Sequence, residues 1–210
     1  MAGVTVEAGP VRAAIAAACD RVRRDAAAVE LLAAVKYLDV ADLGALAEAG
    51  IDLVGENRAQ ELEAKAQNWP ALRWHFIGQL QSRKVRQILS YAQLIHTVAS
   101  DSALEQLGRH GTLETEVLVQ VNVAREKGKA GIDPAELGAF LARCPVRCVG
   151  LMTMPPAAGD PEASRPHFSR LASLARAHSL RHLSMGTSQD YVVAVEEGAT
   201  IVRVGSALYH

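Results

Sequence analysis

The chain has 210 residues, half of them hydrophobic, with 22 lysines and arginines against 23 aspartates and glutamates. A chain of this length can bury a core without help from metals or disulfides, so residues 1–210 are interpreted as a single domain. The balanced charge gives no reason to expect binding to nucleic acid or an anionic membrane. No apolar stretch reaches transmembrane length, and the N-terminal segment mixes arginines into an alanine-rich helical pattern unlike a signal peptide, so a cytoplasmic protein is expected.

Short runs of Val, Leu and Ile alternate with longer helical patterns along the chain. After an N-terminal helix, candidate strands fall at residues 30–36, 52–55, 73–77, 94–98, 116–123, 146–152, 182–185 and 200–204. Such alternation is typical of βα units around a parallel sheet. Eight units in this length predict a compact α/β fold, a single (β/α)8 TIM barrel with an extra N-terminal helix. An open doubly wound sheet is the alternative that the same alternation allows.

Polar residues and glycines gather where the predicted strands end. In a TIM barrel the chemistry collects at the carboxyl ends of the strands, so these residues are candidates for a site. Glycines and hydroxyls at 186–188 and 205–206 suit a phosphate, which backbone N–H groups can approach closely. The candidate site residues are Lys36, Asn57, His75, Met185, Ser188, Arg203, Gly205 and Ser206.

The apolar run VELLAAVK ends on one lysine, Lys36. A lysine partly shielded at a barrel mouth has its ammonium form disfavoured, and its neutral amine can then form a Schiff base with a carbonyl. Pyridoxal phosphate (PLP) is a phosphorylated aldehyde that proteins hold in this way, and its pyridine nitrogen needs a protein partner. Arg203 could be that partner, and because an arginine keeps its proton, the ring would remain a weak electron sink.

Each of these residues also has a structural interpretation. Lys36 could be a surface lysine with a buried stem, and His75, between Trp74 and Phe76, could be a hydrogen-bonded core histidine. Single glycines near strand ends are often ordinary turn residues. No zinc-protease, paired-cysteine, GxSxG or P-loop motif occurs, and the three cysteines lack metal-ligand spacing, so no metal site is predicted.

Seven blocks of the sequence resemble, in order, the blocks of the pyridoxal-phosphate-binding homeostasis proteins, the YggS/PROSC-type family. They are VGEN (54–57), WHFIGQLQSRK (74–84), IHTVAS (95–100), QVNVAREKGKAGI (120–132), GLMTMPP (150–156), LSMGTSQD (183–190) and TIVRVGSALY (200–209). The resemblance implies a barrel like the alanine racemase N-terminal domain, fold type III among PLP proteins, with the cofactor on Lys36.

The same resemblance implies roles for further residues. Phosphate contacts fall on Ser188, Gly205 and Ser206, and the arginine facing the pyridine nitrogen falls on Arg203. Asn57 and His75 match positions on the ring side of the cofactor, and Lys129 matches a lysine to which no role is assigned.

The chain departs from the family pattern at two places near the predicted mouth. AVKYLDV stands where the family has VSKT followed by a basic residue and proline, and QSRK stands for QSNK, with Arg83 at the asparagine position. Neither change removes a residue assigned to the cofactor, but the loop after Lys36 is expected to have a different shape.

The resulting hypothesis is a PLP-binding protein that contributes to intracellular homeostasis of vitamin B6 and amino acids, without a defined turnover reaction. Alanine racemases add a second domain and a partner tyrosine as opposing acid/base, for which this chain has no room. The alternatives are a PLP-dependent amino-acid racemase, a Schiff-base aldolase acting on a phosphorylated sugar, and a purely interaction-based role. A monomer is expected, with PLP as its ligand and the apo forms of PLP-dependent enzymes as candidate partners.

Overall fold

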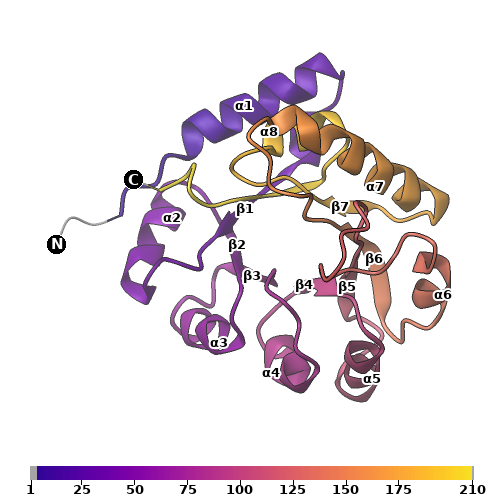
Figure 1. The fold of residues 1–210 in the computed structure, drawn as a ribbon. Coiled ribbons are helices and arrows are strands. Elements are labelled where there is room, and N and C mark those ends of the chain that lie inside the picture. The colour runs from indigo at the N-terminus through magenta and orange to yellow at the C-terminus, as the bar shows by residue number, and fades with distance from the viewer. Residues whose placement is uncertain (1–3, 210) are drawn as a thin grey trace.

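The computed structural model describes residues 4–209, which form a closed barrel of eight parallel strands (Figure 1). The strands are β1 (Glu30–Ala34), β2 (Leu53–Glu56), β3 (Arg73–Phe76), β4 (Leu94–Val98), β5 (Glu116–Gln120), β6 (Arg147–Met152), β7 (His182–Ser184) and β8 (Ile201–Val204). Each strand pairs with the next, and β1 pairs with β8. The TIM barrel prediction is therefore confirmed, and the open sheet is excluded.

Helices surround the barrel in chain order, as Figure 1 shows. They are α1 (Ala8–Arg21), α2 (Gly44–Glu48), α3 (Ala59–Asn68), α4 (Val85–Leu89), α5 (Asp101–His110), α6 (Leu137–Ala142), α7 (Arg165–Ala177) and α8 (Tyr191–Glu196), with short 3-10 helices at Ala26–Ala28, Val40–Leu43, Ser82–Lys84 and Pro161–Ser164. The predicted extra helix is α1, which packs against α8 through an ion pair between Arg21 and Glu196 at 2.6 Å. Among residues 4–209, no helix has both the length and the apolar character needed to cross a membrane.

The strands separate two hydrophobic cores, because successive side chains point to opposite faces of a strand. The larger core lies between the barrel and the helices. The smaller core fills the barrel and consists of Leu32, Leu53, Leu94, Leu118, Val149, Met152 and Ile201. On β1, Leu32 belongs to the interior, and its neighbour Ala33 belongs to the outer core.

β1 and β5 end two and three residues earlier than predicted, and β3 and β7 one residue earlier. β1 ends at Ala34, and the carbonyl of Val35 accepts a hydrogen bond from Lys65 Nζ at 2.8 Å. β5 ends at Gln120, after which the Asn122 side chain bonds the backbone of Glu126 at 2.8 and 3.1 Å and bends the chain into a loop. At β1 a distant side chain takes up a backbone carbonyl that a longer strand would have used, and after β5 the N–H of Asn122 donates to the carbonyl of Ile132.

Candidate functional site

Lys36 lies in the turn directly after β1. Side chains alternate between the two faces of a strand, so Lys36 follows Leu32 and Ala34 on the face toward the barrel axis. The side chain is exposed, and its Nζ atom lies 4.4 Å from the ring centroid of Tyr37, which is itself 84% exposed. Lys36 is therefore open to solvent, and the structure does not show the partial shielding that was expected at the barrel mouth.

A buried ion pair holds the ends of β1 and β2 together. Lys65 on α3 lies 2.7 Å from Glu56 Oε2, and the two side chains are only 2% and 1% exposed. Lys65 also donates to the carbonyl of Val35, next to Lys36, and Glu56 Oε1 accepts from the backbone N–H of Asn57 at 2.7 Å. One pair thus fixes the backbone beside both candidate residues, and each buried charge has its partner.

The side-chain oxygen of Asn57 is buried and has no hydrogen-bond partner among the described residues. A buried acceptor without a donor costs free energy, and such atoms in native structures call for an explanation. Asn57 Oδ1 is therefore available to a donor on a bound molecule at the mouth of β2.

A chain of hydrogen bonds crosses the barrel interior from β3 to β8. His75 Nδ1 lies 3.0 Å from His96 Nε2, His96 Nδ1 lies 2.8 Å from Ser184 Oγ, and Arg203 Nη1 donates to Ser184 Oγ at 2.5 Å. Because Arg203 can only donate, Ser184 can accept from it and give its own proton to His96 Nδ1. His96 then carries its proton on Nε2 and donates to His75, so every bond in the chain runs in one direction.

Burial keeps both histidines of this chain neutral. It lowers the pKa of His75 to about 3 and also lowers the pKa of His96, which is completely enclosed. Neutral imidazoles can each donate once and accept once, as the chain requires. His75 is thus a buried, hydrogen-bonded histidine of the interior, and its contact with a cofactor stays a prediction.

Arg203 is a fixed cation at the β8 end of this series of hydrogen bonds. Its side chain is 4% exposed, and its Nη2 donates to the carbonyl of Thr153 and to Met154 Sδ, both at 3.0 Å. Burial lowers its pKa to about 10, so it remains charged near neutral pH. No carboxylate forms an ion pair with it in the described part of the chain, and its three bonds leave two of the five guanidinium N–H groups for other acceptors.

The loops after β7 and β8 meet at Ser188. Its hydroxyl oxygen accepts from the backbone N–H of Gly205 at 3.0 Å and of Ala207 at 3.2 Å. Two backbone donors that converge on one oxygen form the concave arrangement that binds anions. Ser206 lies between them and is exposed. Both backbone N–H groups are bonded to Ser188 Oγ in this structure, so a phosphate oxygen would take the place of that hydroxyl.

Two expectations at β7 need correction. Met185 is fully buried in the outer core, because alternation after Ser184 turns its side chain away from the barrel interior, so this side chain does not reach the mouth. Thr187 does not offer a free hydroxyl: both its N–H and its hydroxyl donate to Asp190 Oδ1, at 2.7 and 3.0 Å.

Most of the remaining candidates gather where the barrel closes. Leu32 pairs in register with Arg203, and a Cβ atom on Gly205 would lie 3.6 Å from Ala34 Cβ. The lysine turn, the buried guanidinium and the phosphate-type donors therefore share the β1–β8 edge, with Asn57 on the next strand. This set of an amine, a fixed donor and an anion cradle fits a phosphorylated pyridine aldehyde.

Four residues of this network had not been singled out from the sequence. Glu56, His96 and Ser184 lie in the VGEN, IHTVAS and LSMGTSQD blocks, so the blocks marked their segments. Lys65 lies in no block and carried no signal of its own, because its contact with Glu56 forms only when α3 packs beside β2.

Most of the chain matches known proteins. The family model described as alanine racemase, N-terminal domain, matches residues 12–210. The pyridoxal phosphate homeostasis protein of Aquifex aeolicus is 37% identical, and the match covers 91% of each chain. This chain belongs to the pyridoxal phosphate homeostasis protein family.

Solved structures similar to this family member have the same barrel. An unknown protein from Bifidobacterium adolescentis has a TM-score of 0.86 at 32% identity, covering 94% of this chain and 91% of that one. PipY of Synechococcus elongatus PCC7942 has TM-scores of 0.78 without PLP and 0.74 with PLP bound, at 35% and 34% identity, covering 91% of this chain and 98% of PipY. The predicted alanine-racemase-like fold is confirmed.

Proposed function

We propose that this chain binds PLP at the mouth of the barrel, as a Schiff base on Lys36, and serves the intracellular homeostasis of PLP and amino acids. Arg203 carries the proposal, because it is a buried charged donor fixed by Thr153 and Ser184 beside the strand that leads to Lys36. The names of the relatives and the PLP bound to PipY support it.

Each candidate residue has one task in this proposal. Bound PLP would supply an aldehyde and an electron-withdrawing ring. Lys36 would provide the amine, and Arg203 would donate to the ring nitrogen. The loop residues Ser188, Gly205 and Ser206 would hold the phosphate, while Asn57 Oδ1 would accept a hydrogen bond on the ring side.

The properties of Arg203 favour a carrier over an enzyme. Its pKa of about 10 means that it donates a hydrogen bond without giving up its proton, so the ring nitrogen would stay unprotonated and withdraw few electrons. A cofactor held in this way is poorly suited to carbanion chemistry. We therefore propose a monomeric cytoplasmic PLP carrier, able to supply apo-enzymes, with no defined turnover reaction.

The test is an absorption spectrum of the purified chain with and without added PLP, followed by borohydride reduction and peptide mapping. The matched variants are Lys36→Ala and Lys127→Ala, the second removing an exposed loop lysine. We expect a visible band and a reduced adduct on Lys36 in the wild type and in Lys127→Ala, and neither in Lys36→Ala. An adduct that maps elsewhere, or no adduct, would contradict the proposal.

The absence of turnover needs its own measurement. The PLP-loaded protein is incubated with L-alanine or L-serine, and the products are separated on a chiral column. We expect less D-amino acid than one equivalent per protein chain. A stoichiometric excess of D-product would instead support the racemase alternative.

A further inference from the structure

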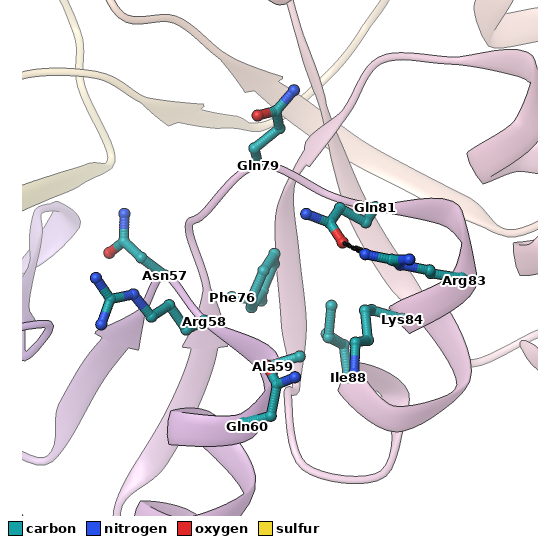
Figure 2. A pocket seen from close by; sticks show the side chains of 10 residues that line it. All are labelled: Asn57, Arg58, Ala59, Gln60, Phe76, Gln79, Gln81, Arg83, Lys84 and Ile88. Carbon is teal, nitrogen blue, oxygen red and sulfur yellow. Dashed lines mark hydrogen bonds between the residues drawn. The ribbon is translucent and has the colours of Figure 1, made fainter.

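We propose that a second pocket on the rim of the barrel binds a phosphate group, either as inorganic phosphate or in a small phosphate monoester. The cavity has a volume of 260 Å³ and lies between the loop that joins β2 to α3 and the loop that joins β3 to α4 (Figure 2). We call it the rim pocket. It is distinct from the phosphate cradle at Ser188 and Gly205, and only Asn57 belongs to both the rim pocket and the candidate PLP site.

The lining of the rim pocket is positively charged. It contains the three cations Arg58, Arg83 and Lys84 and no aspartate or glutamate. The other lining residues are Asn57, Ala59, Gln60, Phe76, Gln79, Gln81 and Ile88. Since the chain as a whole carries a formal charge of −1, this concentration of positive charge is local to the pocket.

None of the three cations is neutralised by the protein. Across the described residues, arginines elsewhere form ion pairs, as Arg73 does with Asp52 and Arg165 with Glu197, whereas no ion pair includes Arg58, Arg83 or Lys84. The acids nearest to Arg58 in sequence lie close to Lys65. Glu56 is buried against Lys65, and Glu61, in the first turn of α3, lies 4.0 Å from Lys65 Nζ.

Glu63, also on α3, accepts from Gln87 on α4 and from Tyr91 just after it, at 2.5 and 2.9 Å. Both of its oxygens are therefore already bonded. Three like charges that share one cavity without a counter-charge repel one another, and a bound anion would relieve that repulsion.

Arg83 is the most firmly placed of the three. Its Nε and Nη2 donate to Gln81 Oε1 at 3.3 and 3.2 Å, which turns the guanidinium over the cavity and leaves Nη1 unbonded (Figure 2). Arg58 stands on the opposite wall as the N-cap residue of α3, and its exposed side chain has no bond that prevents it from turning inward. Lys84 is held only by Gln87 Oε1, at 3.2 Å.

The end of α3 adds donors to the same wall. Arg58 makes no side-chain cap, so the first backbone N–H groups of the helix, at Ala59 and Gln60 in the pocket lining, have no capping acceptor. The helix dipole adds positive potential at this point. The pocket thus combines charged side chains with backbone donors.

A phosphate group matches this lining better than a carboxylate does. A phosphate dianion has two negative charges and several oxygens, four in the free ion and three terminal ones in a monoester, so it can accept from Arg58, Arg83 and Lys84 together. A carboxylate has one charge and two oxygens. The volume of 260 Å³ is several times the ~30 Å³ that one water occupies in the liquid. The organic part of a small monoester would therefore fit beside the phosphate.

The experiment is a calorimetric titration of the full chain with sodium phosphate, glycerol 3-phosphate and, as the carboxylate probe, sodium acetate, all at matched ionic strength. The variants are Arg58→Gln/Arg83→Gln and the control Arg86→Gln, which removes an exposed arginine of α4 outside the pocket. The cradle at Ser188 is unchanged in all of them, so any difference reports the rim pocket. The PLP absorption band is recorded in parallel as an independent readout of the Lys36 site.

We expect the double variant to weaken phosphate binding at the rim pocket at least ten-fold, while Arg86→Gln and the wild type bind alike and acetate binds more weakly. Equal affinity for the two phosphates would identify the free ion as sufficient, and tighter glycerol 3-phosphate binding would identify the monoester. Unchanged phosphate binding in the double variant, or an equal response to acetate, would overturn the proposal whether or not the PLP band appears. A crystal structure of the wild type grown with phosphate gives a second readout, and density for the anion between Arg58 and Arg83 is expected.

Discussion

The ion pair between Glu56 and Lys65 is a buried contact on which the geometry around Lys36 depends. We expect Lys65→Met to lower the free energy of unfolding by about 3–5 kcal/mol, because it leaves the Glu56 carboxylate buried without its partner. Urea denaturation measures this change. Lys127→Met removes an exposed lysine and is expected to shift stability by less than about 0.5 kcal/mol.

A second variant separates lost packing from unpaired charge. Glu56→Gln/Lys65→Met removes both charges, so we expect it to be more stable than Lys65→Met alone. If the double variant were the less stable of the two, the loss would come from packing around α3 and not from the buried carboxylate.

The two neutral histidines make stability depend on pH. His75 has a pKa of about 3 in the folded protein and about 6.5 when unfolded, so between these values the unfolded chain binds a proton that the folded chain does not. Stability is therefore complete above pH 6.5 and falls as the pH decreases toward 3, by up to ~1.4 kcal/mol per pH unit for one such histidine. His96 acts in the same direction.

Urea denaturation between pH 5 and 8 checks this pH dependence. We expect His75→Asn to have a smaller slope of stability against pH than the wild type, whatever its stability at pH 8. His110→Gln, at an exposed position at the end of α5, is the matched control. An identical slope in His75→Asn and the wild type would show that the pKa of His75 is the same in the folded and unfolded protein.

Among the loops, the connection from β7 to α8 depends on a glycine. Gly186 has φ of 90°, and a Cβ atom there would lie 2.5 Å from Ala194 Cβ and 2.8 Å from Tyr191 Cα. Gly198 has a similar φ of 102°, but a Cβ atom there would come no closer than 3.8 Å to its nearest neighbour, Leu183. An alanine would therefore be strained by the positive φ at both positions, but only at position 186 would its Cβ atom also overlap neighbouring atoms.

We expect Gly198→Ala to cost about 1–3 kcal/mol from strain alone. Gly186→Ala should cost ~1–3 kcal/mol more, because α8 must move to make room. It should also weaken PLP binding, since the same loop carries Ser188. Urea denaturation and a spectral titration with PLP measure the two effects, and equal values for both variants would contradict this account.

The strands could be predicted from the sequence because each buried strand is an apolar run between helical patterns. The ends of β1 and β5 could not, because each depends on a partner farther along the chain: Lys65 at Val35 and Ile132 after Gln120. Arg203 was predicted as a candidate site residue, and the structure buries it. Its partners could not be predicted, because Thr153 and Ser184 become its neighbours only when β6, β7 and β8 pair.

The closed barrel bears on the prediction that residues 1–210 are a single domain, which stays a prediction. Trp69 and Trp74 both lie near β3, so their fluorescence reports one side of the barrel, while far-ultraviolet circular dichroism reports all the helices. We expect the two signals to change at the same urea concentration. Two separate transitions would show that parts of the barrel unfold independently.

The pairing of β1 with β8 also bears on how the protein is made. Lys36 follows the first strand to leave the ribosome, and Arg203 lies on the last, so the amine exists long before the groups that would hold its ligand. During synthesis the growing sheet has two unpaired edges, which are sites of aggregation until the last strand arrives. We expect a nascent chain that lacks β8 to retain PLP poorly, because it has the amine of Lys36 but neither Arg203 nor the loop of Gly205.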